Sequence, residues 1–175
     1  VSIRPEAPPR PEGRGFTRDR MKRLALLVFL MINCQAAIAS EAFYRMTQKG
    51  AVACLARAVY KEANTQGSRG REAVMAVIVN RAIEQHKHVC EILKQPSQFS
   101  WVKQGTNVSK LTDDKEAETF VLKVVVKTAR VGYISFNGVQ YFYAHKQGKP
   151  TWANKMVCSR IEDHTFCVEK NMNIL

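Results

Sequence analysis

Residues 51–84, with the sequence AVACLARAVYKEANTQGSRGREAVMAVIVNRAIE, decide the fold of this chain. In the first part of this stretch, apolar side chains recur at spacings of three and four, at Val52, Leu55, Ala58 and Val59. That spacing is the period of a helix with one apolar face, so a helix is predicted over residues 51–63, ending before Gly67. The fold therefore begins with a helix that must pack one side against other elements.

Three more helices are predicted further along the chain. Ser68 is the expected N-cap of the second, and the side chains that recur on one side of it are Val74, Val77, Ile78 and Arg81. A short helix is expected around residues 89–94, before Pro96. A longer helix is expected after its cap Thr112, because acidic residues precede basic ones along it, as the helix dipole favours. These residues are Asp113, Asp114, Glu116 and Glu118, then Lys123, Lys127 and Arg130.

The C-terminal part of the chain has the pattern of β structure. Asn137 and Gly138 form a turn signal, and a strand is predicted at residues 141–143. Two further strands, at residues 157–161 and 164–168, are predicted to pair as a hairpin. The expected fold class is therefore α+β, mainly α-helical with a small β element in the C-terminal half, in the proportions of a lysozyme.

Length and charge limit the classes of function. The chain has 175 residues, of which 46% are hydrophobic, enough for one packed domain. Its formal net charge is +12, and from Ser40 onward 20 Lys and Arg face 12 Asp and Glu, which leaves +8. A basic protein favours polyanions, and nucleic acid, anionic lipid and cell-wall polymers all qualify.

An export signal is predicted near the N-terminus. Met21 to Arg23 form a charged start, residues 24–32 form an apolar run, and residues 37–39 (Ala-Ile-Ala) form a small-x-small cleavage site before Ser40. The apolar run of nine residues is far short of the ~20 needed to span a bilayer, so retention as a membrane anchor is the alternative. The expected organisation is a non-native or disordered extension over residues 1–20, a signal peptide over residues 21–39 and one domain over residues 40–175.

Four cysteines remain after the predicted signal peptide, and an even number in an exported chain favours disulfides. Four cysteines allow three connectivities. Cys158 with Cys167 is favoured because a separation of nine positions can close as a short hairpin, and this leaves Cys54 with Cys90.

Glu62 is the strongest candidate for acid-base chemistry. It lies near the end of the first predicted helix, just before a polar stretch where a cleft can open. Partial desolvation by Tyr60 and other aromatic residues would favour its acid form, as a general acid requires. A glutamate at a helix end is more often a solvated charge, so position alone is weak evidence.

Seven blocks of sequence together resemble the spore-cortex-lytic, or SleB-like, cell-wall hydrolase family. They occur in the order of that family and are residues 54–63, 73–81, 89–90, 98–101, 143–145, 150–153 and 163–166. The resemblance covers roughly residues 50–170. It implies a lysozyme-like fold, lytic transglycosylase activity on peptidoglycan, and a catalytic glutamate in the Tyr-x-Glu-Ala block, which here is Glu62. The family also occurs in phage and prophage lysis cassettes, where such an enzyme serves as an endolysin.

One block departs from the family pattern. The family typically has Glu-Ala-Arg-Gly-Glu, whereas this chain has Glu62-Ala63-Asn64-Thr65-Gln66. The first acid is kept and the second is replaced by an amide. A single carboxyl group is sufficient for a lytic transglycosylase that cuts the MurNAc–GlcNAc bond, because the muramyl 6-hydroxyl of the substrate itself acts as the nucleophile.

Aromatic and amide residues are the candidates for substrate binding. They lie in predicted loops that can line a cleft, or beside Glu62, and are Tyr60, Gln98, Ser100, Trp101, Tyr143, His145 and Trp152. Core packing is the plain alternative for Phe99, and a structural role is at least as well supported for His145. His164 is expected to be structural, and His86 and His88 receive no role.

Two other functions compete with the transglycosylase. One is a zinc-dependent N-acetylmuramoyl-L-alanine amidase with His145, His164 and a carboxylate as ligands, although no compact ligand spacing supports it. The other is a non-catalytic peptidoglycan-binding protein, which the basic charge and Gln66 favour. The preferred interpretation is an exported, periplasmic or extracellular monomer that acts on peptidoglycan without metal or cofactor, does not bind nucleic acid, and meets the membrane only through an uncleaved signal segment.

Overall fold

The computed structural model describes residues 22–23, 41–110, 115–132, 134–136 and 138–170. The chain divides into two compact units, Val1–Cys34 and Gln35–Leu175, and the first is described only at Lys22 and Arg23. The predicted extension and signal peptide therefore fall almost wholly outside the described residues. Within those ranges, none of the helices is long and apolar enough to cross a membrane.

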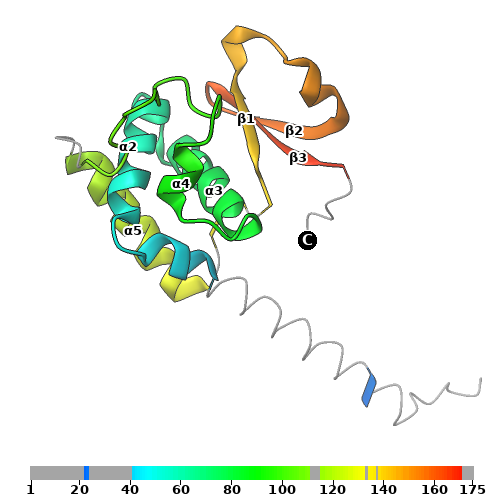
Figure 1. Cartoon of the computed structure of the whole chain (residues 1–175). Helices are drawn as coiled ribbons and strands as arrows, with labels where there is room; N and C mark the ends of the chain where they lie inside the picture. Colours follow the sequence, from blue (N-terminus) through cyan, green and yellow to red (C-terminus); the bar gives the residue numbers. More distant parts are fainter. Residues whose placement is uncertain (1–21, 24–40, 111–114, 133, 137, 171–175) are drawn as a thin grey trace, which may run out of the picture. The chain divides into compact units, whose positions relative to one another are not determined.

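Helices form most of the second unit (Figure 1). After a short helix at residues 41–47 come α2 (Ala51–Ala63), α3 (Ser68–Glu84), α4 (Val89–Leu93) and α5 (Lys115–Val131). The prediction for α2 is confirmed at both ends, that for α4 is confirmed to within one residue, and the start of α3 lies within one residue of its predicted place. The predicted capping residue Thr112 of α5 lies outside the described residues, as do Asp113 and Asp114.

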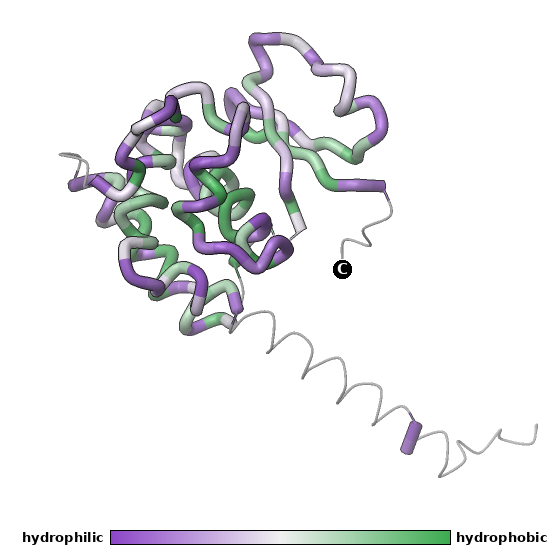
Figure 2. The backbone as a smooth tube through the Cα atoms, in the orientation of Figure 1, coloured by the Kyte–Doolittle hydropathy of each residue, from purple (hydrophilic) through white to green (hydrophobic). Residues whose placement is uncertain are grey.

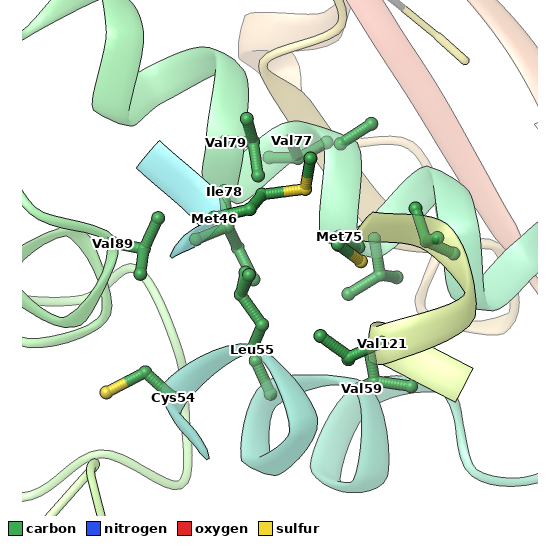
Figure 3. Close-up of a cluster of buried hydrophobic side chains, with 14 of the residues drawn as sticks. Met46, Cys54, Leu55, Val59, Met75, Val77, Ile78, Val79, Val89 and Val121 are labelled. Atoms are coloured by element: carbon green, nitrogen blue, oxygen red, sulfur yellow. The ribbon is translucent and has the colours of Figure 1, made fainter. Parts of the chain in front are cut away.

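Helix α3 is the centre of the hydrophobic core. Its residues from Ala73 to Ala82 are all buried, whereas the spacing had indicated only one buried side. The reason is that α3 has neighbours in several directions, since α2, α4 and β1 (Tyr141–Ala144) all contact it. Figure 2 shows the hydrophobic segments gathered in this helical part, and Figure 3 shows side chains of α2, α3 and α5 meeting in the core, among them Leu55, Ile78 and Val121.

The predicted N-cap Ser68 of α3 was wrong. Gly67 holds the N-cap position and Ser68 is the first helical residue. Gly67 has no side chain that could accept a hydrogen bond from the first N–H groups of the helix, so a residue distant in sequence accepts them. The Glu162 carboxylate accepts hydrogen bonds from the backbone N–H of Gly67 at 2.7 Å and of Gly70 at 3.4 Å.

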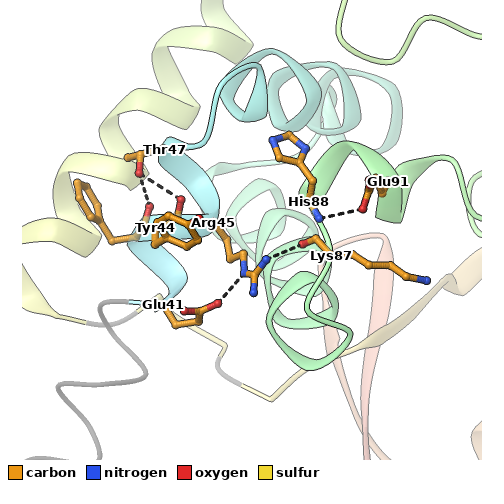
Figure 4. Close-up of polar contacts among 8 residues, drawn as sticks. Glu41, Tyr44, Arg45, Thr47, Lys87, His88 and Glu91 are labelled. Atoms are coloured by element: carbon orange, nitrogen blue, oxygen red, sulfur yellow. Dashed lines mark hydrogen bonds and ion pairs between the residues drawn. The ribbon is translucent and has the colours of Figure 1, made fainter.

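Polar contacts attach the helix at residues 41–47 to the segment before α4 (Figure 4). The half-buried Arg45 side chain donates from Nε to Glu41 at 2.6 Å and from Nη1 to the carbonyl of Lys87 at 3.2 Å. His88, for which the sequence predicted no role, is the N-cap of α4. Its Nδ1 accepts from the N–H of Cys90 at 3.1 Å, and its own N–H donates to Glu91 at 3.2 Å.

A three-stranded antiparallel sheet completes the domain, in the order β1-β3-β2. Strands β2 (Met156–Ile161) and β3 (His164–Glu169) form the predicted hairpin, and β1 confirms the predicted strand at residues 141–143. Two 3-10 turns, η1 (His145–Gln147) and η2 (Thr151–Lys155), connect β1 to β2. The fold is thus mainly α with a small β element, as predicted; Asn137 of the predicted turn lies outside the described residues.

The two faces of β1 have different neighbours because successive side chains of a strand point to opposite sides. Phe142 packs against Phe166 of β3 at a ring-centroid distance of 5.7 Å and against Phe99 of the helical part at 6.4 Å. Its neighbours Tyr141 and Tyr143 both contact Trp152 of η2. The sheet therefore has an inner face toward the helices and an outer face under η2.

Both predicted disulfides are present. Cys54–Cys90 connects α2 to α4 across a sequence separation of 36, and Cys158–Cys167 connects directly paired positions of β2 and β3 across a separation of 9.

Candidate active site

The candidate site is built around Glu62, in the last turn of α2. The indole N–H of Trp101 donates to Oε1 of Glu62 at 2.8 Å, and both side chains are half-buried. Trp101 comes from the loop after α4, so two segments that are distant in sequence meet here. One carboxylate oxygen, Oε1, is committed to this contact.

Burial raises the pKa of the Glu62 carboxyl above its ordinary value, and the hydrogen bond from Trp101 lowers it by a smaller amount. The net direction is upward because removing a carboxylate from water penalises its charged form. Glu62 therefore keeps its proton to a higher pH than an exposed glutamate would. This is the property that a general acid needs near neutral pH.

Trp101 is itself held in place from two sides. The guanidinium of Arg57, five residues before Glu62 on α2, lies 6.0 Å from the centre of the indole ring, and the ring of buried Phe99 lies 6.2 Å away. Arg57 also donates to the carbonyl of Lys110 at 3.3 Å. Trp101 was predicted to bind substrate, and in the structure its indole N–H donates to Glu62.

Gln66, the position where the family has its second acid, is buried beside β3. Its Nε2 is in hydrogen-bonding contact with Nδ1 of His164. Burial lowers the pKa of His164, and Asp163 and Glu162 oppose this effect. Gln66 Oε1 has no hydrogen-bond partner among the described residues. The amide therefore joins the loop after Glu62 to the sheet.

Gln98, another predicted substrate-binding residue, belongs to a network around a buried arginine. Its Oε1 accepts from Nη1 of Arg81 at 2.6 Å, and Nε of Arg81 donates to the carbonyl of Gln140, also at 2.6 Å. The Arg81 guanidinium lies 5.6 Å from the ring centre of Tyr141. Gln98 thus helps to connect α3 to the start of β1.

Two more candidates adjoin the pair in sequence: Tyr60 lies two residues before Glu62, and Ser100 lies directly before Trp101. Ser100 is exposed in the loop that contains Trp101. Tyr60 is half-buried on α2, packs against the core, and has the ammonium of Lys61 at 5.5 Å from its ring centre. Neither residue has a described contact with the Glu62 carboxyl.

Tyr143, His145 and Trp152 form a second group. Tyr143 and Trp152 meet at 5.7 Å in an edge-to-face arrangement, and Nδ1 of His145 lies 3.3 Å from the hydroxyl of Thr165. No described contact joins these three residues directly to Glu62 or Trp101. The structure therefore brings together Glu62 with Trp101, and Tyr143 with Trp152, as two separate pairs.

Sequence reasoning missed Arg57 and Glu162 at this site. Arg57 had no local signal, because five residues separate it from Glu62 on α2, beyond the three or four that place two side chains on one helix face. Glu162 had none, because its role depends on the hairpin reaching the start of α3. Among the described residues, no group of three or more His, Cys, Asp and Glu side chains is placed to hold a metal ion.

Comparison with known families identifies the class of protein. The model of the Cell Wall Hydrolase family matches residues 65–167, which is more than half of the chain. This chain belongs to that family, the SleB-like cell-wall hydrolases, as its sequence blocks had indicated. It is accordingly a hydrolase of peptidoglycan. The matched region begins three residues after Glu62. No curated protein and no solved structure matches the chain.

Proposed function

We propose that this protein is a lytic transglycosylase that cuts the MurNAc–GlcNAc bond of peptidoglycan with Glu62 as its acid and then its base. The observation that carries the proposal is the environment of the half-buried Glu62 carboxyl. The indole N–H of Trp101 donates to it at 2.8 Å, and burial raises its pKa.

The two proton transfers of such a reaction fit one carboxyl group. Trp101 engages Oε1 of Glu62, which leaves Oε2 to carry the proton. This proton goes to the glycosidic oxygen as its bond to C1 of the muramyl sugar breaks, with an oxocarbenium-like transition state. The resulting carboxylate then takes the proton of the muramyl C6 hydroxyl while O6 bonds to C1. Glu62 ends protonated again, and the product has a 1,6-anhydromuramyl end.

The surroundings of Glu62 support a mechanism with one acid. Gln66 carries an amide where the family has a second carboxylate. The Glu162 carboxylate is engaged with the N–H groups of Gly67 and Gly70, and Glu72 forms an ion pair with Lys127 at 2.8 Å. A glycosidase that activates water needs a second carboxylate for that purpose, whereas an intramolecular nucleophile does not.

Mass spectrometry of sacculi digested by the purified protein tests the proposal. We expect fragments that end in 1,6-anhydromuramic acid. Reducing muramyl ends would mean lysozyme-type hydrolysis, and free stem peptides would mean amidase activity; either result would overturn the transglycosylase assignment.

Export of the protein is part of the proposal. The two disulfides, Cys54–Cys90 and Cys158–Cys167, support an oxidising destination such as the periplasm or the cell exterior. N-terminal sequencing of the exported protein should find Ser40 at or near its start. A mature protein that still contains residues 24–32 would point to the membrane-anchored alternative.

A further inference from the structure

A partly exposed aromatic cluster on the outer face of the sheet has no part in the proposed chemistry. We call it the aromatic platform, and it consists of Tyr141, Tyr143 and Trp152. Trp152 is 38% exposed, and its ring lies 5.8 Å from that of Tyr141 and 5.7 Å from that of Tyr143. Phe142, between the two tyrosines, faces the helical part instead.

The platform is fixed in its orientation. Tyr141 and Tyr143 of β1 both contact the ring of Trp152. Ala153, the residue after Trp152, is 1% exposed and anchors η2 in the fold. A large apolar ring that is held rigidly and remains open to water loses little entropy when it binds a ligand. The ring face of tryptophan matches the apolar C–H face of a sugar ring, and its amphipathic character suits a wet binding surface.

The surface beside Trp152 is basic. A hollow of about 740 Å³ adjoins its ring, and its lining includes the ammonium-bearing side chains of Lys155 and Lys170. Glu169 also lines it, at 3.4 Å from the hydroxyl of Tyr141. The sequence from Thr119 to Ile161 contains no Asp or Glu, so η1 and η2 carry cations without acids among them. Such a surface favours a ligand with carboxylates.

We infer that the aromatic platform is a second binding site for the cell wall, one that holds a glycan strand with its stem peptides without cutting it. A sugar ring stacks on Trp152, and Lys155 binds a stem-peptide carboxylate. This inference rests on the proposed function for its ligand, peptidoglycan, but not on Glu62 as the catalyst. A second contact with the same insoluble polymer raises the effective concentration of substrate at the Glu62 site.

Binding of non-cleaving variants to purified sacculi tests the inference, with Glu62→Gln as the parent protein. Adding Trp152→Ala should weaken co-sedimentation with sacculi by about tenfold, as expected for loss of a central aromatic anchor. Trp152→Phe should retain most of the binding. Leu122→Ala is the matched control, because Leu122 is a comparably exposed apolar residue on α5, outside the platform. Binding by Trp152→Ala equal to that of its parent would overturn the platform.

Lys155→Gln tests the charged half of the surface and, because Lys155 is exposed, does not threaten the fold. Its binding to intact sacculi should fall at low salt and approach that of the parent at high salt, where screening removes the charge contact. On sacculi whose carboxylates have been converted to amides the effect should disappear, because no anion is left for Lys155 to bind. An equal loss on both kinds of sacculi would overturn the carboxylate contact.

The two proposals fail separately. Sacculi cleaved by Glu62→Gln at the wild-type rate would remove Glu62 from the mechanism and leave the platform standing if Trp152→Ala still weakens binding. Anhydromuramyl products together with undiminished binding by Trp152→Ala would keep the catalytic proposal and reject the platform.

Discussion

At the scale of single residues, the environment of Glu62 is what suits it to the proposed acid-base role. The same carboxyl in water would be ionised at neutral pH and would have no proton to give. Burial at the end of α2 raises the pKa of the Glu62 carboxyl. The hydrogen bond from Trp101 holds this carboxyl in one orientation. Two effects of opposite sign therefore act on the pKa of Glu62: burial raises it, and the hydrogen bond from Trp101 lowers it while also orienting the carboxyl.

Replacing Glu62 should abolish cleavage without unfolding the protein. Glu62→Gln keeps the shape of the side chain and an oxygen for the Trp101 N–H but removes the proton, so cleavage should fall by about 100-fold or more. Turbidity loss of sacculi measures the rate. Glu72→Gln is the matched control: it gives up only the ion pair with Lys127, worth about 0 to 1 kcal/mol, and should cleave almost like wild type. Near wild-type clearing by Glu62→Gln would contradict the assignment.

The same substitution should not destabilise the protein at neutral pH. Because the folded-state pKa of Glu62 is raised, its contribution to stability is present in acid, below the unfolded pKa, and is lost as the pH rises through the folded pKa. Glu62→Gln cannot ionise, so at neutral pH it should melt at the same temperature as wild type or higher. This advantage should disappear in acid. A clearly lower melting temperature at pH 7 would mean that the ionised carboxylate stabilises the fold.

Trp101→Phe should change the pH dependence of cleavage. It removes the hydrogen bond that lowers the pKa of Glu62, so the alkaline limb of the kcat/KM profile should move to higher pH. The maximum rate should fall by roughly tenfold to a hundredfold because the carboxyl is no longer oriented. Tyr44→Phe, at a 55% exposed residue, is the control and should leave the limb in place. An unmoved limb in Trp101→Phe would separate Trp101 from the titration of Glu62.

At the scale of elements, periodic patterns were predictable and tertiary contacts were not. The bounds of α2 and the β2–β3 hairpin followed from local spacing. The burial of α3 on all sides did not, because it depends on how many neighbours surround the helix. The cap of α3 could not be predicted from local sequence either, because Glu162 lies 95 residues after Gly67 in the chain. For the site, the position of Glu62 was visible in sequence, whereas its pairing with Trp101 required the fold.

Glu162 should therefore stabilise α3 from the hairpin turn. Glu162→Ala removes the acceptor for two N–H groups at the helix N-terminus, where a negative charge is favourable, and should cost about 0.5 to 2 kcal/mol of unfolding free energy. Urea unfolding measures the difference. Asp163→Asn changes the charge of the same turn but leaves both contacts intact, so it should cost less. Equal unfolding free energies of the two variants would show that the Glu162 carboxylate does not cap α3 in solution.

At the scale of the whole molecule, the disulfide Cys54–Cys90 holds together the two segments that form the candidate site. Cys54 lies on α2, which carries Glu62, and Cys90 lies on α4, which leads into the loop with Trp101. The other disulfide, Cys158–Cys167, joins two strands that already pair directly. The two disulfides are therefore expected to differ in both their stabilising and their functional effects.

The closed loops set the expected difference in stability. A disulfide stabilises mainly by restricting the unfolded chain, and the loop-closure relation gives about 4 kcal/mol for a separation of 36 and about 2.5 kcal/mol for one of 9. The double variants Cys54→Ala with Cys90→Ala, and Cys158→Ala with Cys167→Ala, form a matched pair, because each removes one fully buried and one half-buried cysteine. Chemical denaturation should rank the first variant as the less stable. Only the variant that lacks Cys54–Cys90 should also lose cleavage of short soluble fragments while it is still folded, because the loop with Trp101 is then held less firmly against Glu62. An equal loss of cleavage by both variants would mean that neither disulfide acts on the site in particular.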